Sequence, residues 1–229
     1  MEFAQALAVG SDIYVNGAFA VSHRPHTSNV QLASLFERRA AAPSFIRELE
    51  AISRVGAGES TLVILGGSKN DKKDMLAKFA EQPNTNVRVG GKVASLVSPD
   101  DYNTDGRQVV TVAQMTADGF DISEESADGF VNEILSRKYK VIFWNAPVGW
   151  YEGGYREGSR RIAQAISEVT RNGGVFTLIG GGNTVEFVSE ENKLGYPVEV
   201  SYTCVGGGAT LTYLGGEELP AARALQKAA

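Results

Sequence analysis

The sequence is poor in the residues that build disulfide frameworks and metal clusters. It holds one cysteine, Cys204, and two histidines among 229 residues. A lone cysteine excludes an intramolecular disulfide and a cysteine zinc site, which favours a reducing environment. A surplus of positive charge is also missing, because the net charge is −5 at pH 7. We therefore expect no nucleic-acid partner, and any anion would be held by a local site.

Long apolar runs are missing as well. No stretch approaches the roughly eighteen uninterrupted apolar residues of a membrane-spanning helix. The first ten residues, "MEFAQALAVG", lack the basic segment and apolar core of a signal peptide. What is present, 43% hydrophobic and 21% charged residues, is typical of globular proteins. We expect a cytoplasmic protein without a membrane partner.

From Thr61 to Leu214 the sequence repeats an apolar run, a glycine-bearing loop and an amphipathic segment. The runs do not alternate with polar residues, which indicates strands buried on both faces, as in a parallel sheet between helices. The sequence thus predicts an α/β fold, a Rossmann-like three-layer sandwich with a mostly parallel sheet. The predicted strands lie in "TLVILGGSK", "NVRVGGKVASLV", "YKVIFWNAPVGW", "GGVFTLIGGGNT" and "PVEVSYTCVGGGAT".

The first sixty residues follow a different pattern. The segment "DIYVNGAFAVSHRPHTSN" predicts a short strand and a polar loop, and "SFIRELEAISRV" predicts a helix that Ser44 could cap. The segment "GAGES" is typical of a linker. We expect an initial part over 1–43, a helix and linker over 44–60, the α/β domain over 61–215 and a carboxy-terminal tail over 216–229.

Glycine clusters follow four of the predicted strands. In open α/β sheets, ligands bind outside the carboxyl ends of the strands, and amide groups in glycine turns or at helix starts attract anions. The pattern predicts a phosphate compound at this edge, and the alternative is that the glycines only make tight turns. The clusters are Gly66–Gly67, Gly90–Gly91, Gly180–Gly182 and Gly206–Gly208.

The common nucleotide motifs do not match these clusters. The dinucleotide fingerprint needs a third glycine that "GGGNTV" lacks. The Walker pattern needs an earlier glycine and a hydroxyl residue that "GGKV" lacks.

Several motifs in series nevertheless resemble one family. The segments "ILGGSKNDKK", "VIFWNAPVGWYE", "LIGGGNT" and "VGGGATLTYLGGEELP" are similar, in order and spacing, to the nucleotide domain of phosphoglycerate kinases. "DIYVNGAFAVSHRPHTS" and "SFIRELEAI" resemble the end of that family's amino-terminal domain and its interdomain helix. The resemblance implies phosphoryl transfer between 1,3-bisphosphoglycerate and ADP, or back from ATP, with Mg²⁺ as cofactor.

The resemblance also implies site residues. Lys69 and Lys73 would face the phosphates or the moving phosphoryl group, unless they only form a solvated helix face. Glu152 would accept hydrogen bonds from the ribose hydroxyls, although alone it would be taken as a surface carboxylate. The implied nucleotide-binding residues are Gly66, Gly67, Lys69, Lys73, Gly90, Gly91, Glu152, Gly180, Gly181, Gly182, Asn183 and Thr184.

The acid substrate would be bound by the initial segment. Arg24 matches the family arginine that contacts phosphoglycerate, and His23 lies beside it. A metal site at the two histidines of "HRPH" is the weaker alternative, since no cysteine or paired carboxylate is near. The resemblance assigns catalysis to Lys73, Arg24, Gly181 and Gly207.

The sequence also departs from the family. Asn183 stands where the family has the aspartate that helps to hold magnesium, so we expect weakened metal binding there. Lys72 replaces another family aspartate, and the hydroxyl residues before the last glycine cluster are replaced by Cys204 and Val205.

The resemblance implies a shortened member that lacks most of the amino-terminal, phosphoglycerate-binding domain and is abbreviated between "KNDKK" and "VIFWN". A homo-oligomer or a partner chain could supply the missing domain. We interpret the sequence as a phosphoglycerate kinase-like phosphotransferase. The alternatives are a catalytically impaired nucleotide-binding protein of kinase descent and a non-catalytic interaction module.

Overall fold

The computed structural model describes residues 2–67, 71–103 and 109–226. The chain forms two compact units, one of residues 54–205 and one of residues 1–53 together with 206–229. These boundaries differ from the expected ones, because the helix after residue 43 and the last glycine cluster both group with the initial segment. Among the described residues, no helix combines the length and apolar character needed to cross a bilayer.

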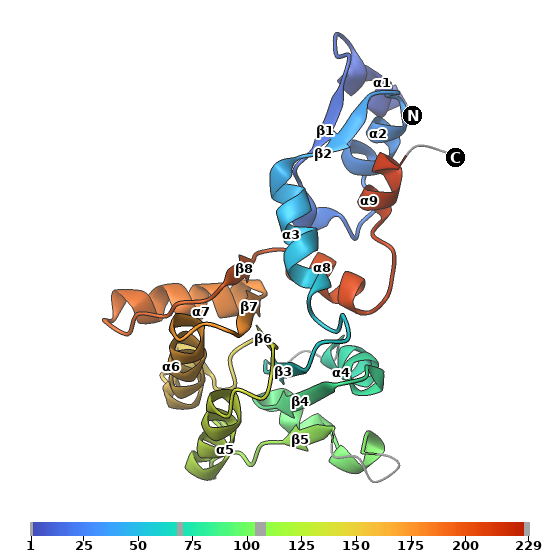
Figure 1. Ribbon diagram of the computed structural model, residues 1–229. Helices are drawn as coiled ribbons and strands as arrows, with labels where there is room; N and C mark the ends of the chain where they lie inside the picture. The colour runs from blue at the N-terminus through green and yellow to red at the C-terminus, as the bar shows by residue number, and fades with distance from the viewer. Residues whose placement is uncertain (1, 68–70, 104–108, 227–229) are drawn as a thin grey trace. The chain divides into compact units, whose positions relative to one another are not determined.

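The larger unit is built on a six-stranded sheet in which all neighbouring strands are parallel (Figure 1). The strand order is β5-β4-β3-β6-β7-β8. Five strands are those predicted, and β5 was not predicted because Thr111 interrupts its apolar residues. Their bounds are β3 Thr61–Leu65, β4 Thr85–Val89, β5 Val110–Val112, β6 Val141–Asn145, β7 Phe176–Gly180 and β8 Tyr202–Cys204.

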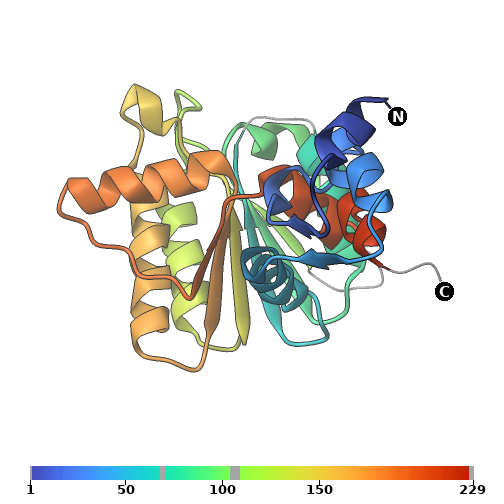
Figure 2. The same cartoon turned by 90° about the horizontal axis from the view of Figure 1, so that it is seen from above.

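Helices cover both faces of this sheet. On one face, alternate residues such as Ile64 and Trp144 pack against α5 (Glu124–Leu135), α6 (Glu157–Arg171) and α7 (Gly182–Lys193). Figure 2 shows α5 and α6 together on that side of the strands.

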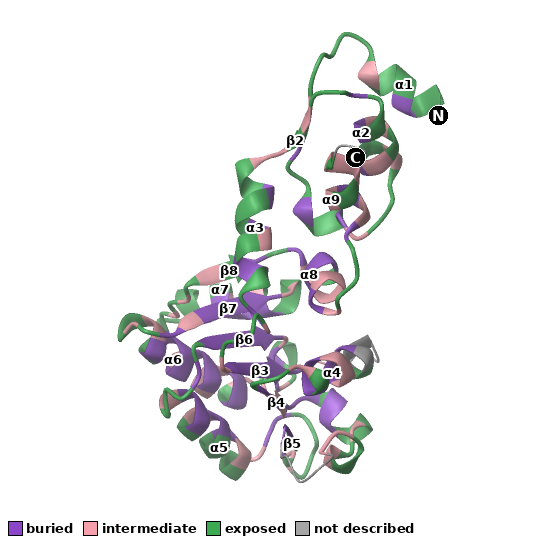
Figure 3. Ribbon diagram, turned by 45° about the vertical axis from the view of Figure 1, so that its right-hand side comes forward, coloured by how far each residue is buried: buried purple, intermediate pink, exposed green. Residues whose placement is uncertain are grey.

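On the other face lies α4 (Asp71–Glu81), whose Phe79 ring is 6.1 Å from the ring of Phe143 on β6. Because both faces are covered, β3 and β6 are buried along their whole length (Figure 3). The structure confirms the predicted α/β sandwich. The connections also contain three short helices, η3 (Lys92–Leu96), η4 (Pro99–Asp101) and η5 (Tyr151–Gly153).

The smaller unit joins both ends of the chain around a core that includes Phe19 and Phe45, whose rings meet edge to face at 5.5 Å. The predicted strand is β1, which pairs in parallel with β2. The predicted cap is wrong, because α3 already begins at Pro43 and therefore includes Ser44. The elements are α1 Glu2–Ala8, β1 Tyr14–Asn16, η1 Phe19–Val21, η2 Thr27–Gln31, α2 Leu32–Ser34, β2 Arg39–Ala41, α3 Pro43–Ser53, α8 Gly207–Leu214 and α9 Pro220–Leu225.

Candidate functional site

Three neighbouring strands of the larger unit end in register at one edge of the sheet. Leu65 of β3 lies opposite Asn145 of β6, and Asn145 lies opposite Gly180 of β7. Since strands are spaced about 4.8 Å apart, the loops after β3 and β7 begin about 10 Å from each other. The carboxyl edge therefore gathers the loops that carry most of the predicted nucleotide residues.

The first glycine pair serves close packing between two of these loops. A Cβ on Gly66 would lie 2.2 Å from the carbonyl oxygen of Pro147. The Gly66 N–H donates to the carbonyl oxygen of Asn145 and the Gly67 N–H to that of Pro147, both at 2.9 Å. These two amides are engaged inside the protein, and the predicted contact of this pair with a nucleotide stays a prediction.

The second pair is packed in the same way. The Gly90 N–H donates to the carbonyl oxygen of Leu65 at 2.8 Å, and a Cβ on Gly90 would lie 2.8 Å from a methyl carbon of Val148. Gly91 has a φ of +65° and lies against the backbone of Gly67. The predicted contact of this pair with a nucleotide stays a prediction.

The third cluster is fastened to the loop after β6 by side chains. The carbonyl oxygen of Gly180 accepts hydrogen bonds from Asn145 Nδ2 at 2.9 Å and from the Thr184 hydroxyl at 2.7 Å. The same hydroxyl accepts from the Ala146 N–H at 2.8 Å. Thr184 is buried, so its side chain fixes the loop.

Beyond this anchor, the amino terminus of α7 is open. Gly181 adopts a φ of +90° at the N-cap position, and no side chain accepts a hydrogen bond there to cap the helix. Gly182 and Asn183 are exposed residues, and their N–H groups meet no acceptor in the described part of the chain. A helix start carries about half a positive charge, so these amides form a suitable anion site.

Two of the predicted charged residues of the larger unit are described, and both are exposed. Lys73 is exposed in the first turn of α4, which follows β3. Glu152 is exposed on η5 in the loop after β6. Lys69 lies outside the described residues. Lys73, Glu152 and the open end of α7 therefore all belong to segments that follow the carboxyl edge of the sheet.

The predicted acid-binding residues lie within the smaller unit. Arg24 is exposed, and its Nε donates to His23 Nε2 at 3.2 Å. A Cβ on Gly208 would lie 2.6 Å from that same nitrogen, which places His23 at the amino terminus of α8, where Gly207 is the first residue. Burial, followed by the charges of Arg24 and His26, lowers the pKa of His23.

A metal ion has few protein ligands at these positions. The described ranges contain no group of three or more His, Cys, Asp or Glu side chains placed to hold one. Asn183 offers one neutral oxygen in the first turn of α7. Magnesium fits here only when the phosphates of a nucleotide supply its other ligands.

One buried carboxylate near the site was not predicted from the sequence. Asp121 accepts hydrogen bonds from the N–H groups of Ile122 at 2.8 Å and Gly158 at 3.1 Å. It therefore caps the start of α6, although it is far from that helix in the sequence. Burial raises the pKa of Asp121. Because Gly158 is 37 residues away, no local pattern could reveal this cap.

Comparison with known proteins tests the family. The phosphoglycerate kinase family model matches residues 1–101 and 95–217. The phosphoglycerate kinase of Haemophilus ducreyi is 31% identical over 275 aligned positions, which cover 100% of this chain and 68% of the relative. The chain belongs to the phosphoglycerate kinase family. That of Porphyromonas gingivalis is 32% identical, with 98% of this chain and 64% of the relative covered.

Solved structures of phosphoglycerate kinases share the fold. The enzyme of Coxiella burnetii matches with a TM-score of 0.78 at 24% identity, over 98% of this chain and 68% of that chain. The enzyme of Pyrococcus horikoshii matches with a TM-score of 0.80 at 20% identity, over 97% of this chain and 65% of that chain. This family member thus spans about two thirds of the length of the relatives that it matches.

The matches also show that the shortening is partly internal. The alignment with the Haemophilus ducreyi relative has more positions than this chain has residues, so the relative carries segments without a counterpart here. The two stretches matched by the family model meet at residues 95–101, between β4 and β5. This junction lies inside the region predicted to be abbreviated.

Proposed function

We propose that this family member is a phosphotransferase that moves a phosphoryl group between 1,3-bisphosphoglycerate and ADP, or from ATP to 3-phosphoglycerate. The observation that carries the proposal is the open amino terminus of α7, at the same sheet edge as the loop that leads to Lys73. Amides and an ammonium group at one edge suit the phosphate chain of a nucleotide.

Positioning and charge stabilisation would supply most of the catalysis, without a covalent intermediate. The N–H groups of Gly182 and Asn183 would bind phosphate oxygens, and Lys73 would stabilise charge on the transferring group. Glu152 would bind the ribose hydroxyls, and Arg24 with His23 would bind the phosphoglycerate. Magnesium, bound by phosphate oxygens, water and Asn183, would neutralise part of the phosphate charge.

A second candidate function is nucleotide binding without efficient transfer. The observation in its favour is Asn183, whose amide lacks the charge with which a carboxylate attracts a hard cation. Both candidates share the nucleotide site and differ in turnover.

Titration calorimetry with ADP and ATP, with and without Mg²⁺, followed by a coupled assay with 3-phosphoglycerate, separates the candidates. Binding with turnover supports the phosphotransferase, and binding without turnover supports the second candidate. The absence of binding would reject both and leave an interaction module.

A matched pair of lysine variants tests the site itself. Lys73→Ala should weaken binding or turnover, whereas Lys193→Ala, at the opposite end of α7, should change neither. Equal effects of the two substitutions would exclude a local role for Lys73.

A further inference from the structure

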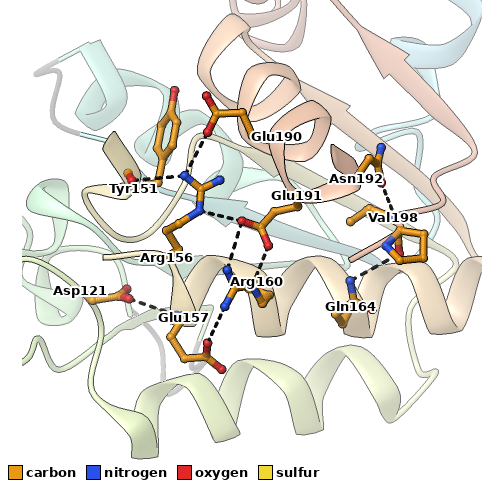
Figure 4. Close-up of polar contacts among 12 residues, drawn as sticks. Asp121, Tyr151, Arg156, Glu157, Arg160, Gln164, Glu190, Glu191, Asn192 and Val198 are labelled. Carbon is orange, nitrogen blue, oxygen red and sulfur yellow. Dashed lines mark hydrogen bonds and ion pairs between the residues drawn. The ribbon is translucent and has the colours of Figure 1, made fainter. Parts of the chain in front are cut away.

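A buried carboxylate on α7 binds two arginine side chains from the start of α6 (Figure 4). Glu191 is fully buried, and its Oε1 accepts from Arg156 Nε at 2.7 Å while its Oε2 accepts from Arg160 Nε at 2.6 Å. Burial acts to raise the pKa of Glu191, but the hydrogen bonds from Arg160 and Arg156 outweigh it and lower that pKa. The carboxylate is therefore charged at neutral pH and ties the two helices together.

Arg156 makes contacts that Arg160 does not. Its Nη1 donates to Glu190 Oε2 at 3.0 Å and to the carbonyl oxygen of Tyr151 at 3.3 Å. Its guanidinium carbon lies 5.1 Å from the centre of the Phe187 ring, within the range of a cation–π contact. Arg156 thus joins α7 to the residue that immediately precedes Glu152.

Tyr151 fixes the other end of the same segment. Its ring meets the Phe187 ring edge to face at 5.5 Å, and its hydroxyl donates to Glu186 Oε2 at 3.2 Å. Between Tyr151 and Arg156 the chain passes through two exposed glycines, of which Gly154 has a φ of +93°. Residues 151–156 are therefore anchored on α7 at both ends, with Glu152 exposed between the anchors.

These contacts connect two parts of the proposed nucleotide site. Glu152 lies in the anchored segment, and the amides proposed to bind phosphate are at the first turn of α7. We propose that Arg156 is a positioning residue that fixes Glu152 relative to these amides, so that one nucleotide can reach both. The inference rests on the proposed function, in which ADP or ATP binds there. Arg156 acts through Glu191 and the Tyr151 carbonyl, and it does not touch the ligand.

Arg160 provides a matched control for a role in stability alone. It binds the same carboxylate, with its Nε donating to Glu191 Oε2 at 2.6 Å and its Nη2 to Oε1 at 3.5 Å. Its other partners are Glu157, at 3.2 Å, and the Tyr196 ring, 4.2 Å from its guanidinium carbon. Removing either arginine weakens the charge pairing of a buried carboxylate, which is strongly destabilising. Only the loss of Arg156 also removes one of the two anchors of the segment that carries Glu152.

The experiment compares ADP affinity in wild type, Arg156→Gln and Arg160→Gln by calorimetry, beside denaturant unfolding. Arg156→Gln should weaken ADP binding by about tenfold, since small misplacements of binding groups are costly. Arg160→Gln should lose comparable stability and bind ADP as wild type does. Equal ADP affinities in the two variants would overturn the inference. If Arg156→Gln fails to fold, Arg156→Lys, which keeps the charge but loses the planar fork, replaces it. This variant too should bind ADP more weakly than Arg160→Gln does.

A second readout does not depend on nucleotide. The chain has two tryptophans, Trp144, which is fully buried, and Trp150, which is 52% exposed and directly precedes the anchored segment. Acrylamide quenching of Trp150 should increase in Arg156→Gln and stay at the wild-type level in Arg160→Gln. Unchanged quenching in both variants would refute the role of Arg156 in fixing this segment. If the wild-type protein binds no ADP but quenching still differs between the two variants, the proposed function is rejected and the positioning role of Arg156 stands.

Discussion

Replacing Gly66 by alanine tests whether the glycines after β3 are required for close packing. The new Cβ would lie 2.2 Å from the carbonyl oxygen of Pro147 and 2.4 Å from that of Ala146. Carbon and oxygen atoms prefer separations of about 3.5 Å, so the two loops would have to separate by about 1 Å. Both atoms belong to the backbone, so no change of side-chain rotamer can relieve the clash.

The magnitude follows from the contacts that this movement breaks. Overpacking of this kind costs about 1–3 kcal/mol. The hydrogen bonds from the N–H groups of Gly66 and Gly67 to the neighbouring loop would weaken as well, each adding about 0.5–1.5 kcal/mol. We expect Gly66→Ala to lower the free energy of unfolding of the larger unit by about 2–6 kcal/mol.

Urea unfolding followed by Trp144 fluorescence is the assay. Trp144 is fully buried in the larger unit, and its Nε1 donates to the Ala146 carbonyl at 2.9 Å, so its emission also reports the displaced loop. Gly182→Ala is the control, because a Cβ there meets no atom within 4 Å and alanine favours the helix by about 0.4–1 kcal/mol. A Gly66→Ala protein as stable as wild type would refute the packing role.

Four further outcomes are expected. Lys73→Ala should lower turnover by about a hundredfold if the ammonium group meets charge in the transition state, as a coupled assay can measure. Asn183→Asp should tighten magnesium-dependent ADP binding in calorimetry, and an unchanged affinity would argue against a metal contact there. Because the folded pKa of Glu191 lies below its ordinary 4.5, the stability it contributes is complete above that pH and is lost as the pH falls through the folded pKa; Glu191→Gln should flatten this acid limb in urea unfolding. The imidazole of His23 should titrate below 6.5 in NMR, and a midpoint above that value would contradict its burial.

The fold could be predicted because its signals are local. The apolar runs at β3 and β6 are continuous, since both faces of a central parallel strand are covered. The strand β5 gave no such signal, because Thr111 interrupts its apolar residues and only one of its three residues is buried. The start of α3 was misplaced by two residues, from Phe45 after a Ser44 cap to Pro43, because proline at a first helical position competes with a serine cap as a signal.

The candidate site could be predicted only as a set of segments. Glycines at Gly66 and Gly90 have the same sequence signature as those at Gly181 and Gly182, although the first two donate their amides to neighbouring loops and the amide of Gly182 stays open. Which amides are engaged depends on contacts with Pro147 and other residues far away in the sequence. No periodicity or motif records such contacts.

The partners of charged side chains could not be predicted from the sequence either, and under the proposed function this matters for Arg156. The sequence shows Arg156 and Arg160 four residues apart, a spacing that on an exposed helix indicates only a shared face. The structure places both on one buried carboxylate, and Arg156 additionally on the backbone beside Glu152. Under the proposed function, a neutral Asn183 would weaken the metal's contribution to nucleotide binding. The remaining affinity would then depend more on how accurately Glu152 and the α7 amides are placed. We therefore expect Arg156→Gln to weaken ADP binding more in the wild-type background than in the Asn183→Asp background. Measuring ADP affinity in the single and double variants with magnesium present tests this coupling, and strictly additive effects would contradict it.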